Sequence, residues 1–136
     1  MKTKSSSQVG GNHYDKMEME PVELMVKLKF NWFQGEVLKY ISRDKNGIED
    51  LHKAIQVCDI AKTMGVVNDL DVSCLTALEL IKEYCDQFMR LDYDKFTVVQ
   101  YMMFLEIVTA IAVSNWDVAS NTIVQLRDSL YGSEEG

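Results

Sequence analysis

The sequence predicts an all-α protein, a compact bundle of about five to six helices with one loop segment near its N-terminus. Apolar residues recur at the three- and four-residue spacing of a helix, and turn or capping residues divide them into separate stretches. No alternating strand pattern appears, and no Asn-Gly turn joins two β-branched runs. A chain of 136 residues with 47% hydrophobic content also suits one well-filled core.

The first two helices are expected over residues 21–29 and 32–43. Pro21 favours the first position of a helix, and Asn31 is the expected N-cap of the second. Gly35 costs roughly 1 kcal/mol relative to Ala inside a helix, so it predicts the close approach of a neighbour or ligand. The expected apolar faces consist of Val22, Met25, Val26 and Leu28 in the first helix, and of Phe33, Val37, Leu38 and Ile41 in the second.

The third helix is expected from residue 48 to about 64, ending at Gly65. A polar connector over residues 66–72 leads to Ser73, the expected cap of a fourth helix that reaches about Leu91. The core positions are Ile48, Leu51, Ile55 and Cys58 in the third helix, and Leu75, Leu78, Leu80 or Ile81, Cys85 and Phe88 in the fourth.

The fifth helix, over about residues 95–113, is apolar around most of its circumference. Gln100 and Glu106 interrupt it and no basic flank follows, which argues against a membrane span. We expect it at the centre of the core and also at a homo-oligomer interface. Ser114 then begins a capping box for the last helix, over residues 115–131. Its inward residues are Trp116, Ala119, Ile123, Leu126 and Leu130.

The domain organisation follows from this order of helices. We expect a flexible arm over residues 1–9, one helical domain over residues 10–131 and a frayed tail over residues 132–136. Residues 10–64 form the motif-bearing half of the domain, and residues 73–131 form its core and oligomerisation half.

The charge and the cysteines limit the class of protein. A formal net charge of −7 argues against broad nucleic-acid binding, which needs many cations to displace counterions. Cys58, Cys74 and Cys85 form no Cys-x-x-Cys pair, so we interpret them as small core residues in a reducing compartment. The polar N-terminus lacks the apolar run of a secretory signal. Together these features predict a cytoplasmic protein with no membrane partner.

A polar stripe marks the predicted hairpin of the second and third helices. Four residues at positions i, i+3, i+4 and i+7 share one helix face: Glu36, Lys39, Tyr40 and Arg43. Asp50 and Lys53 continue the stripe after the turn over residues 44–47. Such a hairpin can surround a phosphate with cations. The alternative is a set of surface ion pairs, each worth a few tenths of a kcal/mol.

The N-terminal loop carries the motif Gly10-Gly11-Asn12-His13-Tyr14. A Gly-Gly pair lets the backbone approach a ligand and turn its N–H groups toward an anion. His13 is either a ligand contact or an ordinary surface residue, whereas His52 is expected to be exposed.

These motifs together resemble a small family found mostly in bacteriophage genomes. The resemblance covers residues 9–61 and rests on Gly10 to Tyr14, Pro21, Gly35 to Tyr40 with Arg43, and Gly47 to Ala54. Many members are described only as domains of unknown function or nucleotide kinases. One is a deoxynucleoside monophosphate kinase without the usual phosphate-binding loop. The Walker loop and the Gly-x-Gly-x-x-Gly fingerprint are both absent here too.

The resemblance implies a nucleotide kinase that uses ATP as phosphate donor and Mg²⁺ as cofactor. On this hypothesis, Gly10, Gly11, Asn12, His13, Tyr14 and Tyr40 bind the nucleotide, and Lys39, Arg43, Lys45 and Lys53 neutralise phosphate. Glu36 and Asp50 hold Mg²⁺ or orient the attacking oxygen.

Two other classes of function stay open. An all-α nucleoside triphosphate pyrophosphohydrolase would bind magnesium through acids such as Glu20, Glu23, Glu79, Glu83 and Asp86. A non-catalytic protein would bind a nucleotide or a host protein through its acidic surface and the apolar helix.

Overall fold

A computed structural model of the chain describes residues 17–43, 46–90 and 96–132. These segments contain six α-helices and no strand, so the predicted all-α class is confirmed. The helices are α1 (Pro21–Leu28), α2 (Trp32–Ser42), α3 (Ile48–Met64), α4 (Cys74–Asp86), α5 (Val98–Ala112) and α6 (Trp116–Tyr131). A short 3-10 turn, η3 (Gln87–Met89), extends α4. None of the described helices has the length and apolar character that crossing a membrane requires.

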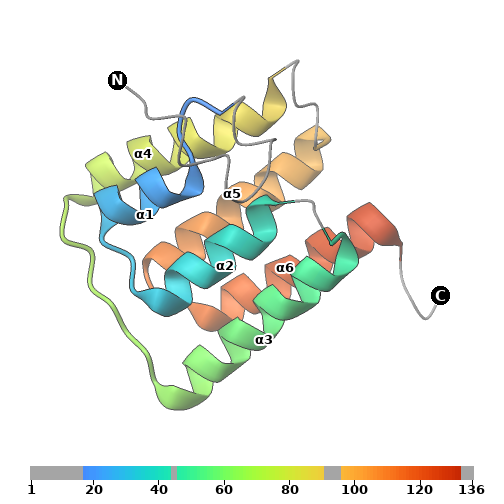
Figure 1. The fold of residues 1–136 in the computed structure, drawn as a ribbon, viewed down its shortest axis with the longest axis horizontal. Coiled ribbons are helices and arrows are strands. Elements are labelled where there is room, and N and C mark those ends of the chain that lie inside the picture. Colours follow the sequence, from blue (N-terminus) through green and yellow to red (C-terminus); the bar gives the residue numbers. More distant parts are fainter. Residues whose placement is uncertain (1–16, 44–45, 91–95, 133–136) are drawn as a thin grey trace.

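Four of the helices pack in a ring around the core. Helix α2 packs against α3, α3 against α6, α6 against α5, and α5 against α2 (Figure 1). Helices α1 and α4 lie side by side and cover one side of this ring, where α1 contacts α2 and α4 contacts α5. The buried centre includes Tyr84, Phe88, Phe104 and Ile107, with aromatic rings in mutual contact. Helix α5 therefore belongs to the core, as predicted.

Most predicted helix ends are confirmed because local hydrogen bonds set them. The side chain of Asn31 accepts a hydrogen bond from the backbone N–H of Gln34, and α3 ends at Gly65 with φ +69°. Gly35 also has the predicted close neighbour. A Cβ atom at this position would lie 3.1 Å from the sulfur of Met25 on α1. The neighbour is therefore another helix of the same chain.

Three predicted helix ends are wrong. The α-helical part of α4 ends at Asp86 and tightens into η3, short of the predicted residue 91. Helix α5 begins at Val98 because Thr97 and Gln100 form a capping box that the prediction overlooked. The N-cap of α6 is Asn115, whose side chain accepts a hydrogen bond from the backbone N–H of Val118.

Ser114, the predicted cap of α6, has another role. Its backbone is left-handed, with φ +60°, and its hydroxyl accepts a hydrogen bond from the backbone N–H of Asn68 at 2.9 Å. A contact with the distant connector therefore occupies the oxygen that would have capped the helix.

The predicted inward faces of α2, α3 and α6 are confirmed in the main, whereas those of α1 and α4 are partly wrong. The buried predicted residues include Leu28, Val37, Leu38, Ile41, Leu51, Cys58, Ile81, Cys85, Phe88, Trp116, Ala119, Ile123 and Leu126. The exposed ones are Val22, Val26, Leu75 and Leu78. Cys74, predicted in the core, is also exposed because it is the first residue of α4. Both helices carry apolar residues on more than one face, so periodicity could not select the buried one.

Two buried glutamines hold distant segments together. Gln34 Nε2 donates to the carbonyl of Ile111 at 2.8 Å, and Gln34 Oε1 accepts from Asn68 Nδ2 at 2.7 Å. These bonds join α2 to the end of α5 and to the connector between α3 and α4. Gln87 Oε1 accepts from the backbone N–H groups of Glu18 and Met19 at 2.8 and 2.9 Å, which fixes the segment before α1 against η3.

Candidate functional site

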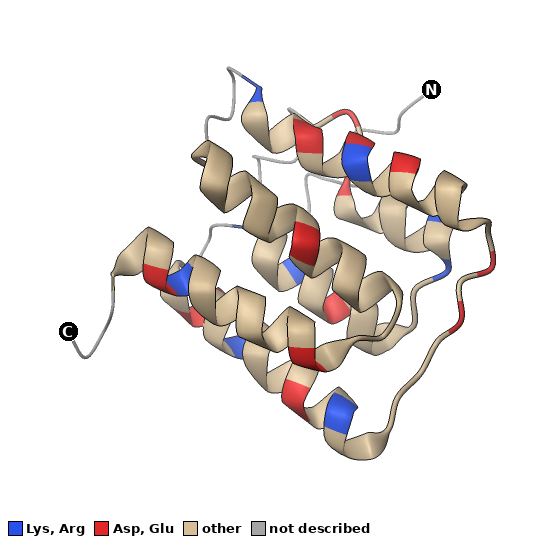
Figure 2. Ribbon diagram, turned by 180° about the vertical axis from the view of Figure 1, so that it is seen from behind, with Lys and Arg blue, Asp and Glu red and all other residues tan. Residues whose placement is uncertain are grey.

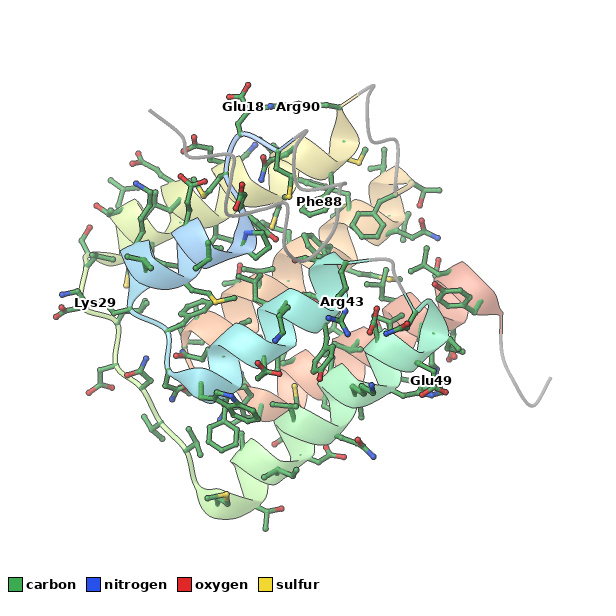
Figure 3. All side chains as sticks on the ribbon, in the orientation of Figure 1. Glu18, Lys29, Arg43, Glu49, Phe88 and Arg90 are labelled. Carbon is green, nitrogen blue, oxygen red and sulfur yellow. The ribbon has the colours of Figure 1, made fainter. Side chains whose placement is uncertain are left out.

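The α2–α3 hairpin brings together the candidate residues that the structure describes. Glu36, Lys39 and Tyr40 lie on α2, and Arg43 is the residue that ends it. Asp50 lies in the first turn of α3, near the side chain of Arg43, which points from the end of α2 toward α3 (Figure 3). The structure thus brings the described residues of the predicted stripe together from two helices, although Asp50 itself is buried.

Tyr40 is the centre of this surface. The guanidinium carbon of Arg43 lies 4.9 Å from the centroid of the Tyr40 ring. The Nζ atoms of Lys39 and Lys53 lie 5.8 and 5.9 Å from the same centroid. These distances allow cation–π attraction. Three cationic side chains from two helices therefore gather around one ring, on a chain whose formal net charge is −7. We call Lys39, Tyr40, Arg43 and Lys53 the Tyr40 cluster.

Asp50 is buried, with 1% of its surface exposed, and it forms an ion pair with Arg43. Its Oδ1 atom accepts a hydrogen bond from Arg43 Nε at 3.1 Å, and Arg43 Nη2 lies 3.1 Å from the same oxygen. Its Oδ2 atom accepts one from the backbone N–H of Asn46, also at 3.1 Å. These contacts hold together the end of α2, the start of α3 and Asn46, which precedes α3.

The pKa of Asp50 reflects these contacts. Burial alone would raise this pKa, but the hydrogen bonds from Arg43 and Asn46 and the charge of Arg43 outweigh burial and hold the pKa below its ordinary value. Asp50 is therefore ionised at neutral pH. Because Asp50 is buried and its oxygens accept hydrogen bonds from Arg43 and Asn46, a metal ion or a reacting group could reach it only if these contacts rearrange.

Glu36 is the other predicted magnesium ligand. Its Oε2 atom lies 3.0 Å from Lys39 Nζ, and its side chain is 17% exposed, against 40% for Lys39. In the described part of the chain, no three His, Cys, Asp or Glu side chains group together as metal ligands would. Mg²⁺ is commonly bound by one or two carboxylates together with phosphates of the substrate, and Glu36 suits that mode.

The remaining predicted site residues are residues 10–14, which form the Gly-Gly-Asn-His-Tyr motif, and Lys45. They lie outside the described residues. His52 is exposed, as expected. The predicted site omitted Asn46, although Asn directly before Gly at a helix start is a common hydrogen-bonding position. The backbone N–H and side chain of Asn46 both donate to Asp50.

The acids of the pyrophosphohydrolase hypothesis do not form an equivalent cluster. Glu79, Glu83 and Asp86 line a shallow surface pocket of about 330 Å³ on α4, together with Lys82 and Arg90. Asp86 is already paired with Lys82 Nζ at 2.8 Å and hydrogen-bonded by the hydroxyl of a tyrosine on α5. The remaining two acids, at the start of α1, do not line this pocket.

Comparisons of the chain with models of protein families, with curated proteins and with solved structures find no match.

Proposed function

We propose that the protein binds a nucleotide at the Tyr40 cluster and acts as a nucleoside monophosphate kinase. The observation that carries this proposal is the convergence of three cations on one aromatic ring in an acidic protein. A phosphate group is the ligand chemistry that such cations favour, and an aromatic ring adds a stacking surface for a base. The resemblance of residues 9–61 to the phage family supports the same site.

Each residue of the cluster has a distinct role in this proposal. Lys39, which pairs with Glu36, and the exposed Lys53 are the cations that reach phosphate oxygens. Arg43, whose guanidinium is already oriented by Asp50, offers a fixed positive charge beside them. The motif over residues 10–14 contacts the base, the sugar or a phosphate.

The proposed reaction transfers the γ-phosphoryl group of ATP. A phosphate oxygen of the nucleoside monophosphate attacks the γ-phosphorus, the bond from that phosphorus to the β,γ-bridging oxygen breaks, and ADP leaves with the electron pair. Charge neutralisation and positioning are the main demands of this chemistry. Mg²⁺ held by Glu36 would supply part of that neutralisation when bound.

Non-catalytic nucleotide binding is the second candidate, and one observation favours it. Asp50, the predicted group for orienting the attacking oxygen, has both oxygens engaged by Arg43 and Asn46. If that arrangement persists with ligand bound, the protein holds a nucleotide without activating it.

A homo-oligomer through α5 and a cytoplasmic location are also part of the proposal.

Nucleotide binding and turnover test these candidates directly. The purified protein is incubated with ATP, magnesium and a panel of deoxynucleoside monophosphates, and its affinity for each nucleotide is measured by calorimetry. A diphosphate product supports the kinase, and saturable binding without product supports the non-catalytic protein. Release of pyrophosphate supports the hydrolase instead, and no binding of any nucleotide rejects the proposal.

Two lysine variants test the position of the site. Lys39→Ala and Lys53→Ala should each weaken nucleotide binding about tenfold or more, because each removes a charge-assisted contact to phosphate. Lys27→Ala is the matched control, since Lys27 is an exposed lysine on α1 outside the cluster. Unchanged affinity in both cluster variants would place the site elsewhere.

A further inference from the structure

The fold itself compensates most of the positive charge of the Tyr40 cluster. Arg43 is paired with a buried carboxylate of α3, and Lys39 Nζ lies 3.0 Å from Glu36 Oε2. Within the described segments, Lys53 is exposed and forms no ion pair. Three cations thus meet two carboxylates, and the one formal charge left uncompensated is that of Lys53.

The two ion pairs differ in how firmly their cations are held. Asp50 is buried and also accepts a hydrogen bond from the backbone N–H of Asn46, so the pair with Arg43 is part of the hairpin's structure. Lys39 is 40% exposed, and its only printed ion-pair partner, Glu36, lies one turn away on the same helix. The pair between Glu36 and Lys39 is therefore the one that a ligand can break.

Glu36 stands where it can compete with a bound anion. The Lys39 ammonium that it holds also lies 5.8 Å from the centroid of the Tyr40 ring. Lys39 could contact a phosphate and Glu36 together only with the carboxylate beside the phosphate, and like charges at that separation repel. Phosphate and carboxylate therefore compete for one ammonium group.

We propose that Glu36 sets the anion affinity of the Tyr40 cluster by holding Lys39 until a phosphate displaces it. This inference rests on the proposed anion site and does not depend on catalysis. A phosphate monoester carries nearly two negative charges at neutral pH. One charge is met by Lys53, which is uncompensated, and the second competes with Glu36 for Lys39. The site thus takes a terminal phosphate at the cost of an internal ion pair.

The burial of Glu36 determines the size of the effect. Loss of a fully exposed ion pair would change anion affinity only about twofold. The side chain of Glu36 is 17% exposed, so water screens its charge less than that of a surface acid. Removing this carboxylate also removes its repulsion of the phosphate. We therefore expect the neutral variant Glu36→Gln to bind phosphate about fivefold more tightly than the wild type.

Anion binding in the absence of magnesium tests this competition. The full chain is titrated at about 0.15 M ionic strength, with a chelator present, against inorganic phosphate and the four common deoxynucleoside monophosphates. Glu36→Gln keeps the size of the side chain and removes its charge, so each anion that binds the wild type should bind the variant about fivefold more tightly. Because magnesium is left out, the proposed role of Glu36 as a metal ligand does not affect the result.

Two controls separate the competition from a change in overall charge. Glu106→Gln makes the same change in net charge on α5, whose one acidic residue is seen in Figure 2 from the side opposite to Figure 1, and should change affinity less than about twofold. In a Lys39→Ala background, Glu36→Gln should also gain less than about twofold. There Glu36 acts only by repulsion from a distance, which salt at a Debye length of about 8 Å largely screens.

The outcomes distinguish this inference from the proposed function. Unchanged or weaker anion binding by Glu36→Gln overturns the inference and leaves the nucleotide site standing. An equal gain with and without Lys39 also overturns it, because Glu36 would then act through its charge alone. The expected gain for inorganic phosphate, with no nucleotide bound, supports the inference and rejects nucleotide binding. No binding of any anion by either protein rejects both. Circular dichroism checks that each variant folds, and Glu36→Ala replaces Glu36→Gln if the latter does not.

Discussion

Replacing Arg43 with Ala should destabilise the fold by about 3 kcal/mol, because it leaves the buried carboxylate of Asp50 without its counter-charge. Two unit charges 3.1 Å apart attract by roughly 5 kcal/mol at an effective dielectric constant of about 20. Removing one partner of a buried pair commonly costs about 3–5 kcal/mol. We take the lower end because Arg43 is 22% exposed and water already screens part of its charge.

The neutral replacement Asp50→Asn should cost less, about 2 kcal/mol, because it removes the charge and keeps a hydrogen-bond acceptor for Asn46. The double variant Arg43→Ala/Asp50→Asn should then be more stable than Arg43→Ala alone. In the double variant the side chain at position 50 is neutral, so no buried charge is left without a partner. Urea denaturation of the four proteins at neutral pH measures each free energy of unfolding.

The same pair predicts a dependence of stability on pH. The pKa of Asp50 is lower in the folded chain than its ordinary value of 3.8. The unfolded state therefore binds a proton first as the pH falls, and the stability from the ionised carboxylate is present above about pH 4. It is lost as the pH falls through the lowered pKa of the folded state. The difference in free energy of unfolding between the wild type and Asp50→Asn should therefore shrink as the pH falls.

Two outcomes would refute this reasoning about the pair. One is a loss below about 0.5 kcal/mol in both single variants, which is typical of an exposed ion pair. The other is strict additivity in the double variant, which would mean that the two side chains act independently. Lys39→Ala is the control, since its partner Glu36 lies on the same helix surface and the change should leave stability within about 0.5 kcal/mol.

Three further variants or reagents test the scaffold that holds the site. Gln34→Ala should cost about 2 kcal/mol, because it removes the buried hydrogen bonds to the carbonyl of Ile111 and from the side chain of Asn68, and limited proteolysis should then cut the connector between α3 and α4 faster. Gln87→Ala should cost a similar amount and expose the segment before α1 to faster hydrogen exchange, whereas unchanged exchange would mean that this segment is held by other contacts. A thiol reagent should label Cys74 rapidly in the native protein, and Cys58 and Cys85 only after denaturation. Burial raises the pKa of the Cys58 thiol to about 12 and also raises that of Cys85, so rapid labelling of more than one thiol would contradict the packing.

Local chemistry was sufficient for most of the helix boundaries. The cap at Asn31 and the end of α3 at Gly65 depend on groups within a few residues of each other, so the sequence contains the whole interaction. The same holds for the polar stripe of α2, because a spacing of three and four residues places side chains on one face wherever the helix lies.

Contacts between distant segments decided the rest. The connector residue Asn68 engages Ser114, so Asn115 caps α6 in its place. The packing of α4 against α5 and α1 buries Ile81 and Cys85 and leaves Leu75 and Leu78 exposed, although the spacing of these apolar residues predicted that all four face inward.

The candidate site divides in the same way. The sequence placed Arg43 and Asp50 near one another and suggested that both were available to a ligand. Only the packed hairpin made Asp50 a buried, hydrogen-bonded ion-pair partner. Periodicity determines which side chains share a helix face. The depth at which that face is buried depends on the helices that pack against it, and these come from distant parts of the chain.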